Sequence, residues 1–284
     1  MENVKTGLIM EGGAMRGMFT AGVTDIMMEN GITFDGAIGV SAGAAFGCNF
    51  KSNQPGRVIR YNSTYCRDPR YAGLRSLIKT GNLFGAEFCY VEIPQKLDIF
   101  DEEAFINNPM EFYVVCTDIE TGEVIYHRCG DSLNELEWFR ASASLPLAAK
   151  PVEVDGKKLL DGGIGDSIPL KHFESIGYNR NVVILTQPKG FVKQKNKLVP
   201  IIRRVLKEYP KVAELLSNRH NDYNNTIAYI EEREKNGEIL VIRPPVALNI
   251  KPVCRDPEEL YRVYNIGRKV GEEMLEQIKD FLNK

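Results

Sequence analysis

The sequence predicts an α/β fold of three layers, in which helices cover both faces of a mainly parallel sheet. Apolar segments of strand length alternate with helical patterns in the first half of the chain, as a strand at 4–10, a helix near 16–29, a strand at 37–40 and a helix from 42. This alternation is typical of βαβ units. Both strands run into glycine-rich turns, and ligands of such sheets bind at the carboxyl ends of strands.

The composition is that of an ordinary globular chain. Its 284 residues are 43% hydrophobic and 26% charged, with a formal net charge of -2. This charge argues against a nucleic-acid partner, and no apolar run reaches the roughly 18 residues that a membrane span requires. Residues 1–5 lack the basic and apolar regions of a signal peptide, so we expect a cytoplasmic protein. The six cysteines lack CxxC spacing, which predicts reduced thiols and neither a metal site nor a cofactor.

Gly39-Val40-Ser41-Ala42-Gly43 places one serine where a buried strand meets a helix of small residues. A sharp strand-to-helix turn of this kind is a nucleophile elbow, which exposes the serine hydroxyl. The first amides of the helix then point at the oxygen that becomes negative during acyl transfer. The alternative is a turn of small residues packed for its own sake.

A second glycine-rich loop, Glu11-Gly12-Gly13-Ala14-Met15-Arg16-Gly17, follows the first strand. Its small residues let the backbone approach a ligand, and the unpaired amides of the next helix form an anion site. The loop lacks the Lys-Ser/Thr of a Walker A motif and matches GxGxxG only loosely, so nucleotide binding is the weaker interpretation.

Asp161 ends a predicted hairpin whose turn is Asp155-Gly156 and whose first arm is 152–154. Gly162 and Gly163 follow it and leave room around its carboxylate. Taken alone, Asp161 would be an ordinary turn aspartate. Asp166 is the other candidate carboxylate, and we expect it to cap the next turn.

Together, EGGAMRG, GVSAG and DGGIGDSIP resemble the bacterial members of the patatin-like phospholipase family, over about residues 4 to 190. The resemblance implies a three-layer α/β/α patatin-like hydrolase that cleaves carboxylic esters of lipids through an acyl-enzyme. It implies Ser41 as the nucleophile and Asp161 as the base of a catalytic dyad. The oxyanion-hole residues that it implies are Gly12, Gly13, Ala14 and Arg16. Ala14 stands where the family has a third glycine, and alanine tolerates positive φ poorly.

Other activities remain open at this point. An acyltransferase or a thioesterase would use the same serine and differ only in the acceptor. A lipid- or nucleotide-binding module without activity would keep the glycine loop but not a reactive Ser41. The head group, the acyl-chain length and the oligomeric state are not predicted.

The three histidines, His127, His172 and His220, bear on the dyad independently. A Ser-His-Asp hydrolase on this type of fold needs a histidine after the acid in chain order. His172 falls at the start of a predicted helix and His220 in a polar segment, so neither is placed for this role. An aspartate acting alone as the base needs a site poor in water.

Two regions have alternative interpretations. Residues 65–100 are rich in aromatic side chains and form either a cap over the site or part of the core. The basic segment 193–211 predicts either a helix at a membrane surface, which would make the protein peripheral to the inner membrane face, or the solvated face of a core helix.

The domain prediction divides the chain at residue 190. Residues 1–190 form the catalytic domain, with a hairpin of 111–117 and 123–127 and a strand at 182–186. Residues 191–284 form an α-rich extension on the same core. It has one strand at 238–243, and its last helix begins at Asp256-Pro257.

Overall fold

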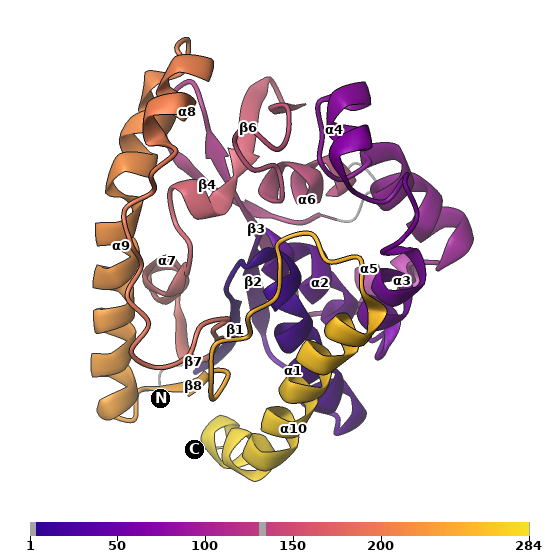
Figure 1. Ribbon diagram of the computed structural model, residues 1–284. Coiled ribbons are helices and arrows are strands. Elements are labelled where there is room, and N and C mark those ends of the chain that lie inside the picture. Colours follow the sequence, from indigo (N-terminus) through magenta and orange to yellow (C-terminus); the bar gives the residue numbers. More distant parts are fainter. Residues whose placement is uncertain (1–3, 131–134, 284) are drawn as a thin grey trace.

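One mixed sheet organises the molecule, as a computed structural model shows for residues 4–130 and 135–283 (Figure 1). Within these residues eight strands form the sheet, in the order β5-β6-β3-β2-β1-β7-β8, with β4 also paired to β3. The strands in chain order are β1 (Lys5–Met10), β2 (Gly36–Val40), β3 (Glu111–Asp118), β4 (Val124–Arg128), β5 (Val152–Val154), β6 (Lys157–Asp161), β7 (Tyr178–Ile184) and β8 (Ile239–Ile242). The predicted three-layer α/β/α class is confirmed.

Helices cover both faces of the sheet. The helices before the third strand are α1 (Gly17–Glu29), α2 (Ala42–Lys51), α3 (Arg57–Tyr65), α4 (Leu74–Thr80) and α5 (Glu102–Asn107), with short η1 (Ala14–Arg16) and the π-helix η2 (Phe88–Leu97). Those after it are α6 (Leu136–Ser142), η4 (Gly162–Ile164), α7 (Leu170–Ser175), α8 (Val199–Val205), α9 (Pro210–Lys235) and α10 (Pro257–Leu282). Within the described chain no helix is long and apolar enough to cross a membrane.

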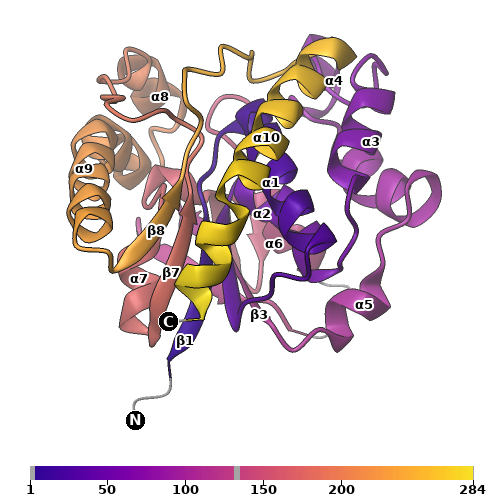
Figure 2. The same ribbon diagram turned by 90° about the horizontal axis from the view of Figure 1, so that it is seen from below.

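Alternation along the strands divides the core between two faces. In β1, Leu8 and Met10 pack with α1, α2 and α10, whereas Ile9 packs with α7 and α9. Figures 1 and 2 show the same division, with α1 and α10 on one side of the sheet and α7 and α9 on the other. This two-sided burial explains why the strands are apolar at nearly every position.

The pairing of β3 brings two strand ends together. The strand β2 runs parallel to β3 and ends with Val40 opposite Val115, whereas β6 runs antiparallel to β3 and ends with Asp161 opposite Cys116. Cys116 also pairs with β4 on the other edge of β3, so β6 must share the edge that β2 occupies. The carboxyl ends of β2 and β6 therefore meet head to head.

The C-terminal segment joins the same sheet and core. The strand β8 is parallel to β7, and α10 crosses α1 at glycines on both helices. A Cβ on Gly22 would lie 2.2 Å from the carbonyl oxygen of Tyr264, and one on Gly267 would lie 2.1 Å from that of Phe19. Only glycine allows the two helices to approach this closely. The cap of α10 is as predicted, because the Asp256 carboxylate accepts a hydrogen bond from the Glu258 amide at 3.1 Å.

Most predicted elements are present with shifts at their ends. The first helix begins as η1 and becomes α-helical at Gly17 rather than at residue 16, and the predicted strand at 182–186 is β7, which begins earlier, at Tyr178. The expectation that residues 1–5 are not part of a signal peptide rests partly on residues 1–3. These three lie outside the described residues.

Candidate active site

The turn after β2 is a strained elbow with Ser41 at its apex. Ser41 has φ 55° and ψ -120°, a backbone conformation that non-glycine residues rarely adopt. The two flanking glycines are required by contact: a Cβ on Gly39 would lie 2.5 Å from the Ala44 amide nitrogen, and one on Gly43 would lie 2.3 Å from the Met10 carbonyl oxygen. The helix α2 is thereby held against the ends of β1 and β2, which keeps Ser41 at the tip of the turn.

Ser142, at the end of α6, holds the elbow from the other side. Its hydroxyl accepts a hydrogen bond from the Ser41 amide at 2.9 Å and donates one to the Val115 carbonyl at 2.6 Å. The side chain is fully buried. Ser142 therefore ties the serine turn to β3, at the point where β6 also arrives.

Asp161 is buried beside this turn, with 2% of its surface exposed. Its Oδ1 accepts a hydrogen bond from the Gly163 amide at 2.7 Å, while its Oδ2 has no partner of good hydrogen-bond geometry among the described residues. Burial raises the pKa of Asp161, and hydrogen bonding with the Ser41 side chain, the charge of Arg219 and the Gly163 amide lower it in part. The unpartnered oxygen and the raised pKa are the properties of a carboxylate that can accept a proton.

The residue after Asp161, Gly162, has no room for a side chain. A Cβ at this position would lie 2.2 Å from the Val115 carbonyl oxygen, the same oxygen that Ser142 binds. A larger residue would push the end of β6 away from β3. The motif glycine thus permits the close approach of Asp161 to the Ser41 turn.

The glycine-rich loop after β1 lies against the elbow. A Cβ on Gly12 would lie 3.1 Å from the Ser41 Cβ, and one on Gly13 would lie 2.8 Å from the Thr186 Oγ1. Ala14 has φ 47°, so alanine here does adopt the positive φ that favours glycine. Arg16 donates a hydrogen bond through Nε to the Thr186 hydroxyl at 3.3 Å. Of the four loop residues singled out from the sequence, Gly12 and Ala14 therefore lie beside Ser41, whereas Gly13 and Arg16 contact Thr186.

The side chain of Glu11 anchors this loop to two other segments of the chain. Its buried carboxylate accepts hydrogen bonds from the Thr186 amide at 2.6 Å and from the Tyr223 hydroxyl at 2.8 Å. Tyr223 comes from α9, more than two hundred residues away in the chain. Arg219, one turn earlier on α9, donates hydrogen bonds to the Gly163 carbonyl and to the Ser167 hydroxyl. The helix α9 therefore supports both the glycine loop and the segment after Asp161.

An apolar cavity of about 470 Å³ opens beside Ser41. Ser41, Ala14 and Met15 line it together with side chains from α2, α3, η2, α5 and α6 and from the segments between them. In the segment 65–100, Tyr71, Phe84 and Tyr90 line this cavity, and Tyr71 and Phe84 also pack with Tyr65 and Phe88 in a small core. The core interpretation therefore holds for part of the segment, and a cap over the site stays a prediction. A site of this volume and lining accommodates an apolar ligand.

Asp166, His127 and His172 have structural contacts, whereas the Nδ1 of His220, on α9, is buried without a hydrogen-bond partner among the described residues. Asp166 accepts hydrogen bonds from the Tyr126 hydroxyl at 2.9 Å and from the Ile168 amide at 3.1 Å, so it caps the turn as expected. His127 pairs with Glu135 at 2.6 Å and stacks on Trp138. His172 stacks on Tyr126, and burial lowers its pKa. Neither histidine has a contact with Ser41 or Asp161 among these interactions.

The contributions of Ser142, Glu11, Tyr223 and Arg219 were not predicted. Ser142 lies in the small-residue segment 140–146, but its partner on the elbow is 101 residues away in the chain. Nothing local in α9 distinguishes Tyr223 and Arg219 from other polar residues of a surface helix. Within the described ranges, no three His, Cys, Asp or Glu side chains come together as a metal site.

The chain is similar to several known proteins. Residues 8–173, more than half of the chain, match the family described as patatin-like phospholipase, and residues 209–283 match a domain family of unknown function. The chain is 25% identical over 284 residues to the uncharacterized protein YjjU of Escherichia coli K12, covering 99% of this chain and 80% of that protein. It is 24% identical over 296 residues to lysophospholipase NTE1 of Coccidioides immitis, covering 96% of this chain but only 18% of that protein. VipD from Legionella pneumophila, a solved structure, matches with a TM-score of 0.47 at 12% identity, covering 97% of this chain and 67% of that one.

Replacing Ser142 tests whether its hydroxyl holds the elbow. Ser142→Ala leaves the buried Ser41 amide without its partner, a loss of about 1–3 kcal/mol, so we expect the melting temperature to fall by roughly 3–8 °C. Ser144→Ala is the matched control, because Ser144 follows α6 and its hydroxyl donates a hydrogen bond to the Arg140 carbonyl of that helix. Equal melting temperatures for the two variants would show that the Ser142 bridge contributes nothing.

Proposed function

Because the chain belongs to the patatin-like phospholipase family and is a lipid ester hydrolase, we propose that it cleaves the acyl ester of a lysophospholipid-type lipid through Ser41 and Asp161. The observation that carries this proposal is the meeting of β2 and β6 on one edge of β3, which sets a strained serine beside a buried carboxylate. The name of the fungal relatives supports the lysophospholipid class. This chain spans about a fifth of their length, so their activity is carried over only as part of the proposal.

In the proposed mechanism, Asp161 accepts the proton of the Ser41 hydroxyl as its oxygen attacks the acyl carbonyl. The backbone amides of Gly12, Gly13 and Ala14 stabilise the negative oxygen of the tetrahedral intermediate. The alcohol leaves with the proton from Asp161, and water then attacks the acyl-enzyme by the same route. Burial supports the role of Asp161, because a raised pKa makes its carboxylate a stronger base.

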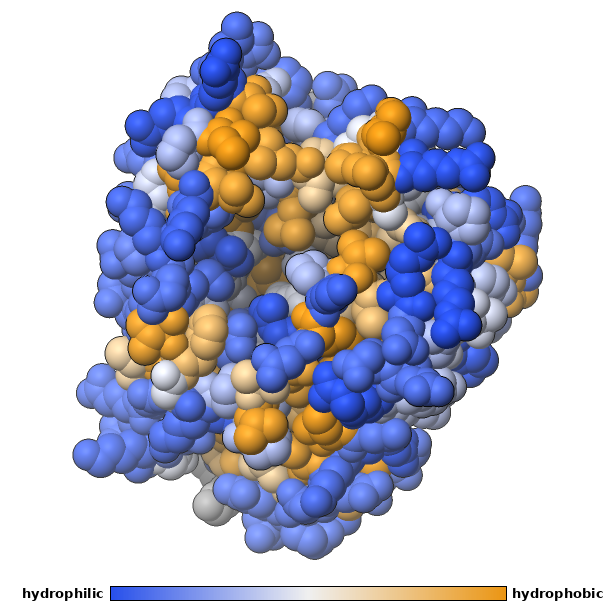
Figure 3. All heavy atoms as spheres, in the orientation of Figure 1, coloured by the Kyte–Doolittle hydropathy of each residue, from blue (hydrophilic) through white to orange (hydrophobic). Residues whose placement is uncertain are grey.

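The apolar cavity is proposed to hold the acyl chain. It begins at Ser41 and is lined mainly by aromatic and aliphatic side chains, so an ester bound at Ser41 has an apolar path for its chain. Figure 3 shows apolar surface on both sides of the hollow in the upper half of this face. Burial of the chain there favours long acyl groups through the hydrophobic effect.

Two substitutions test the dyad. Ser41→Ala removes the nucleophile and Asp161→Asn keeps the shape but cannot take the proton, so each should lower kcat for a p-nitrophenyl ester by about a thousandfold or more. Ser41→Ala should also abolish labelling by a fluorophosphonate.

Because Asp161 must be ionised to act, kcat/KM of the wild type should fall on acidification, with a midpoint above the usual aspartate pKa of about 3.9.

Asp166→Asn is the matched control for Asp161→Asn. It removes a carboxylate of the same segment that is held by Tyr126 and Ile168. The proposal fails if Asp166→Asn is inactive while Asp161→Asn keeps near wild-type activity, or if Ser41→Ala retains turnover.

A second test concerns histidine. A Ser-His-Asp enzyme loses several orders of magnitude in kcat without its histidine, whereas the proposed dyad has none to lose. His127→Ala, His172→Ala and His220→Ala should each keep kcat within about tenfold of the wild type, a change of roughly 1.4 kcal/mol in the barrier. A variant with an unchanged melting temperature and a thousandfold loss of kcat would refute Asp161 as the sole base.

We also propose that the protein contacts a lipid surface through α4 and α8. Leu74 and Ile78 on α4 are 69% and 78% exposed, and Ile201 and Val205 on α8 are 54% and 59% exposed. In Figure 1, α8 stands at the upper left and α4 at the upper right, and Figure 3 shows apolar surface in both places. The basic residues Arg203, Arg204 and Lys207 belong to or follow α8, as is typical of helices that bind anionic lipid surfaces.

Charged substitutions test this contact. Ile78→Asp and Ile201→Asp should each reduce sedimentation with phosphatidylglycerol vesicles by about tenfold, because one aliphatic side chain contributes about 1.5–3 kcal/mol on burial. Ile176→Asp is the control, since Ile176 is also exposed but lies just before β7, outside α4 and α8. Melting temperatures establish that the variants fold. Equal losses for all three variants, or no loss for any, would contradict a specific lipid-facing surface.

A further inference from the structure

Three cationic side chains gather beside the glycine loop. Arg16 comes from η1, Lys193 from the loop after β7 and Arg219 from α9. Their contacts are with neutral groups: Arg16 binds the Thr186 hydroxyl, Arg219 binds the Gly163 carbonyl and the Ser167 hydroxyl, and the Lys193 ammonium lies 4.2 Å from the centre of the Tyr223 ring. Among the described residues none of the three forms an ion pair with a carboxylate.

The three cationic side chains outnumber the carboxylates that act on them. Among the described residues, Glu11 acts on Lys193 and on Arg219, and Asp161 acts on Arg219, so two carboxylates face the three cations. Glu11 already accepts two hydrogen bonds, from Thr186 and Tyr223. Burial, Arg219 and Arg16 lower the pKa of Lys193 to about 8, against the opposing effect of Glu11. An ammonium held where its charge is disfavoured gains stability when an anion binds beside it.

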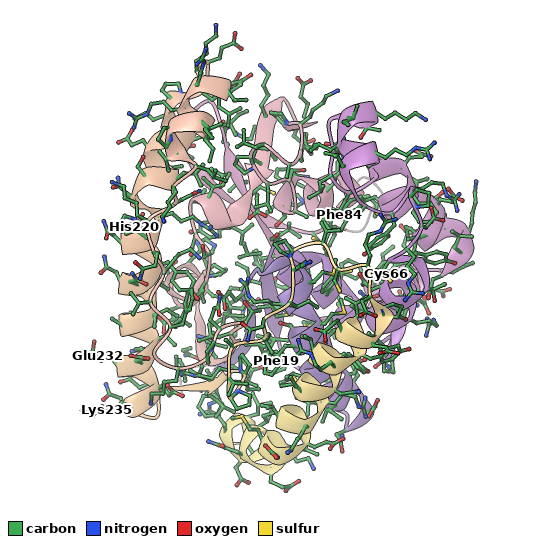
Figure 4. All side chains as sticks on the ribbon, viewed as in Figure 1. Phe19, Cys66, Phe84, His220, Glu232 and Lys235 are labelled. Atoms are coloured by element: carbon green, nitrogen blue, oxygen red, sulfur yellow. The ribbon has the colours of Figure 1, made fainter. Side chains whose placement is uncertain are left out.

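The cations lie across the site from the acyl cavity. The cavity is lined by residues from 14 to 145, on the side of α2, α3 and η2, whereas Lys193 and Arg219 belong to the C-terminal segment. Figures 1 and 2 both place α9 and α3 on opposite sides of the molecule. In Figure 4 the labelled His220, next to Arg219 in the chain, lies on α9, and Phe84 of the cavity lies on the other side of the centre. An ester whose acyl chain fills the cavity therefore directs its alcohol portion toward the cations.

We propose that Arg16, Lys193 and Arg219 bind a phosphate group. Two guanidinium groups and one ammonium supply directed donors and charge for phosphate oxygens. Arg16 retains both terminal nitrogens and Lys193 its ammonium as donors without another hydrogen-bond partner in the described chain. The phosphate comes either from the head group of a lysophospholipid bound for cleavage or from a free phosphate. The first source rests on the proposed function, since it places the ester at Ser41.

Lys193→Gln is the informative variant, because the Lys193 side chain makes no hydrogen bond in the described structure while its backbone bonds to Asn224 remain. The assay compares kcat/KM for lysophosphatidylcholine and for a monoacylglycerol of the same acyl chain in mixed micelles. Loss of one charge-assisted contact of about 1.5–3 kcal/mol should lower the ratio of the two values by about tenfold or more. Lys195→Gln removes an exposed charge from the same loop and should leave the ratio unchanged. An unchanged ratio in Lys193→Gln, or an equal fall in Lys195→Gln, would overturn a head-group site.

Binding to the Ser41→Ala protein separates this proposal from the proposed function. Glycerophosphocholine and inorganic phosphate are titrated calorimetrically into Ser41→Ala and into Ser41→Ala with Lys193→Gln. Lys193-dependent binding of glycerophosphocholine supports the head-group source, and Lys193-dependent binding of phosphate alone supports a free-phosphate site and overturns the head-group source. Binding of neither ligand overturns the phosphate site even if the Ser41 enzyme hydrolyses esters. Lys193-dependent binding by an enzyme that cleaves no ester supports the site and refutes the function.

Discussion

The site depends on one edge of β3 being shared by two strands that arrive from opposite directions. Val40 ends β2 opposite Val115, and Asp161 ends β6 opposite Cys116. Backbone hydrogen bonds therefore fix the spacing of the serine turn and the aspartate before any side chain contributes. Ser142 reinforces the junction, because its hydroxyl bonds both to the Ser41 amide and to the Val115 carbonyl. A catalytic pair built on strand ends is held more precisely than one built on loops.

The glycines of the three motifs follow from this crowding. Gly39 and Gly43 let α2 lie against the strand ends, and Gly162 lets β6 reach the Val115 carbonyl. These requirements are local enough to leave a pattern in the sequence. The motifs consequently predicted the fold class, the elbow and the position of Asp161 at a strand end, and the patatin-like resemblance is confirmed by the family match over residues 8–173. The catalytic roles of Ser41 and Asp161 and of the loop residues stay predictions.

What could not be predicted are contacts that join distant parts of the chain. Tyr223 bonds to Glu11 and Arg219 to Gly163, yet in sequence both are ordinary polar residues of a long surface helix. The segment 65–100 combines lining and core residues because aromatic side chains serve both environments and have no pattern that separates them. The basic segment 193–211 likewise has cationic side chains in two environments. Lys193 lies over the ring of Tyr223, whereas Arg203 and Arg204 are exposed on α8.

The helix α9 consequently has a larger part in the site than its position in the chain suggests. Through Tyr223 it holds the Glu11 carboxylate under the glycine loop, and through Arg219 it places a positive charge near Asp161. Burial favours the neutral form of Asp161, whereas the Ser41 side chain, the charge of Arg219 and the Gly163 amide favour the ionised form, so the balance of these effects sets how readily the carboxylate is ionised. Arg219 is itself buried enough for its pKa to be lowered, and Asp161 and Glu11 are the first charges that compensate it. Each of these groups is tolerated in the interior because of the others. A change in the C-terminal segment that displaced α9 would therefore alter the surroundings of Asp161 and of the glycine loop together, although no residue of that segment carries a recognisable catalytic motif.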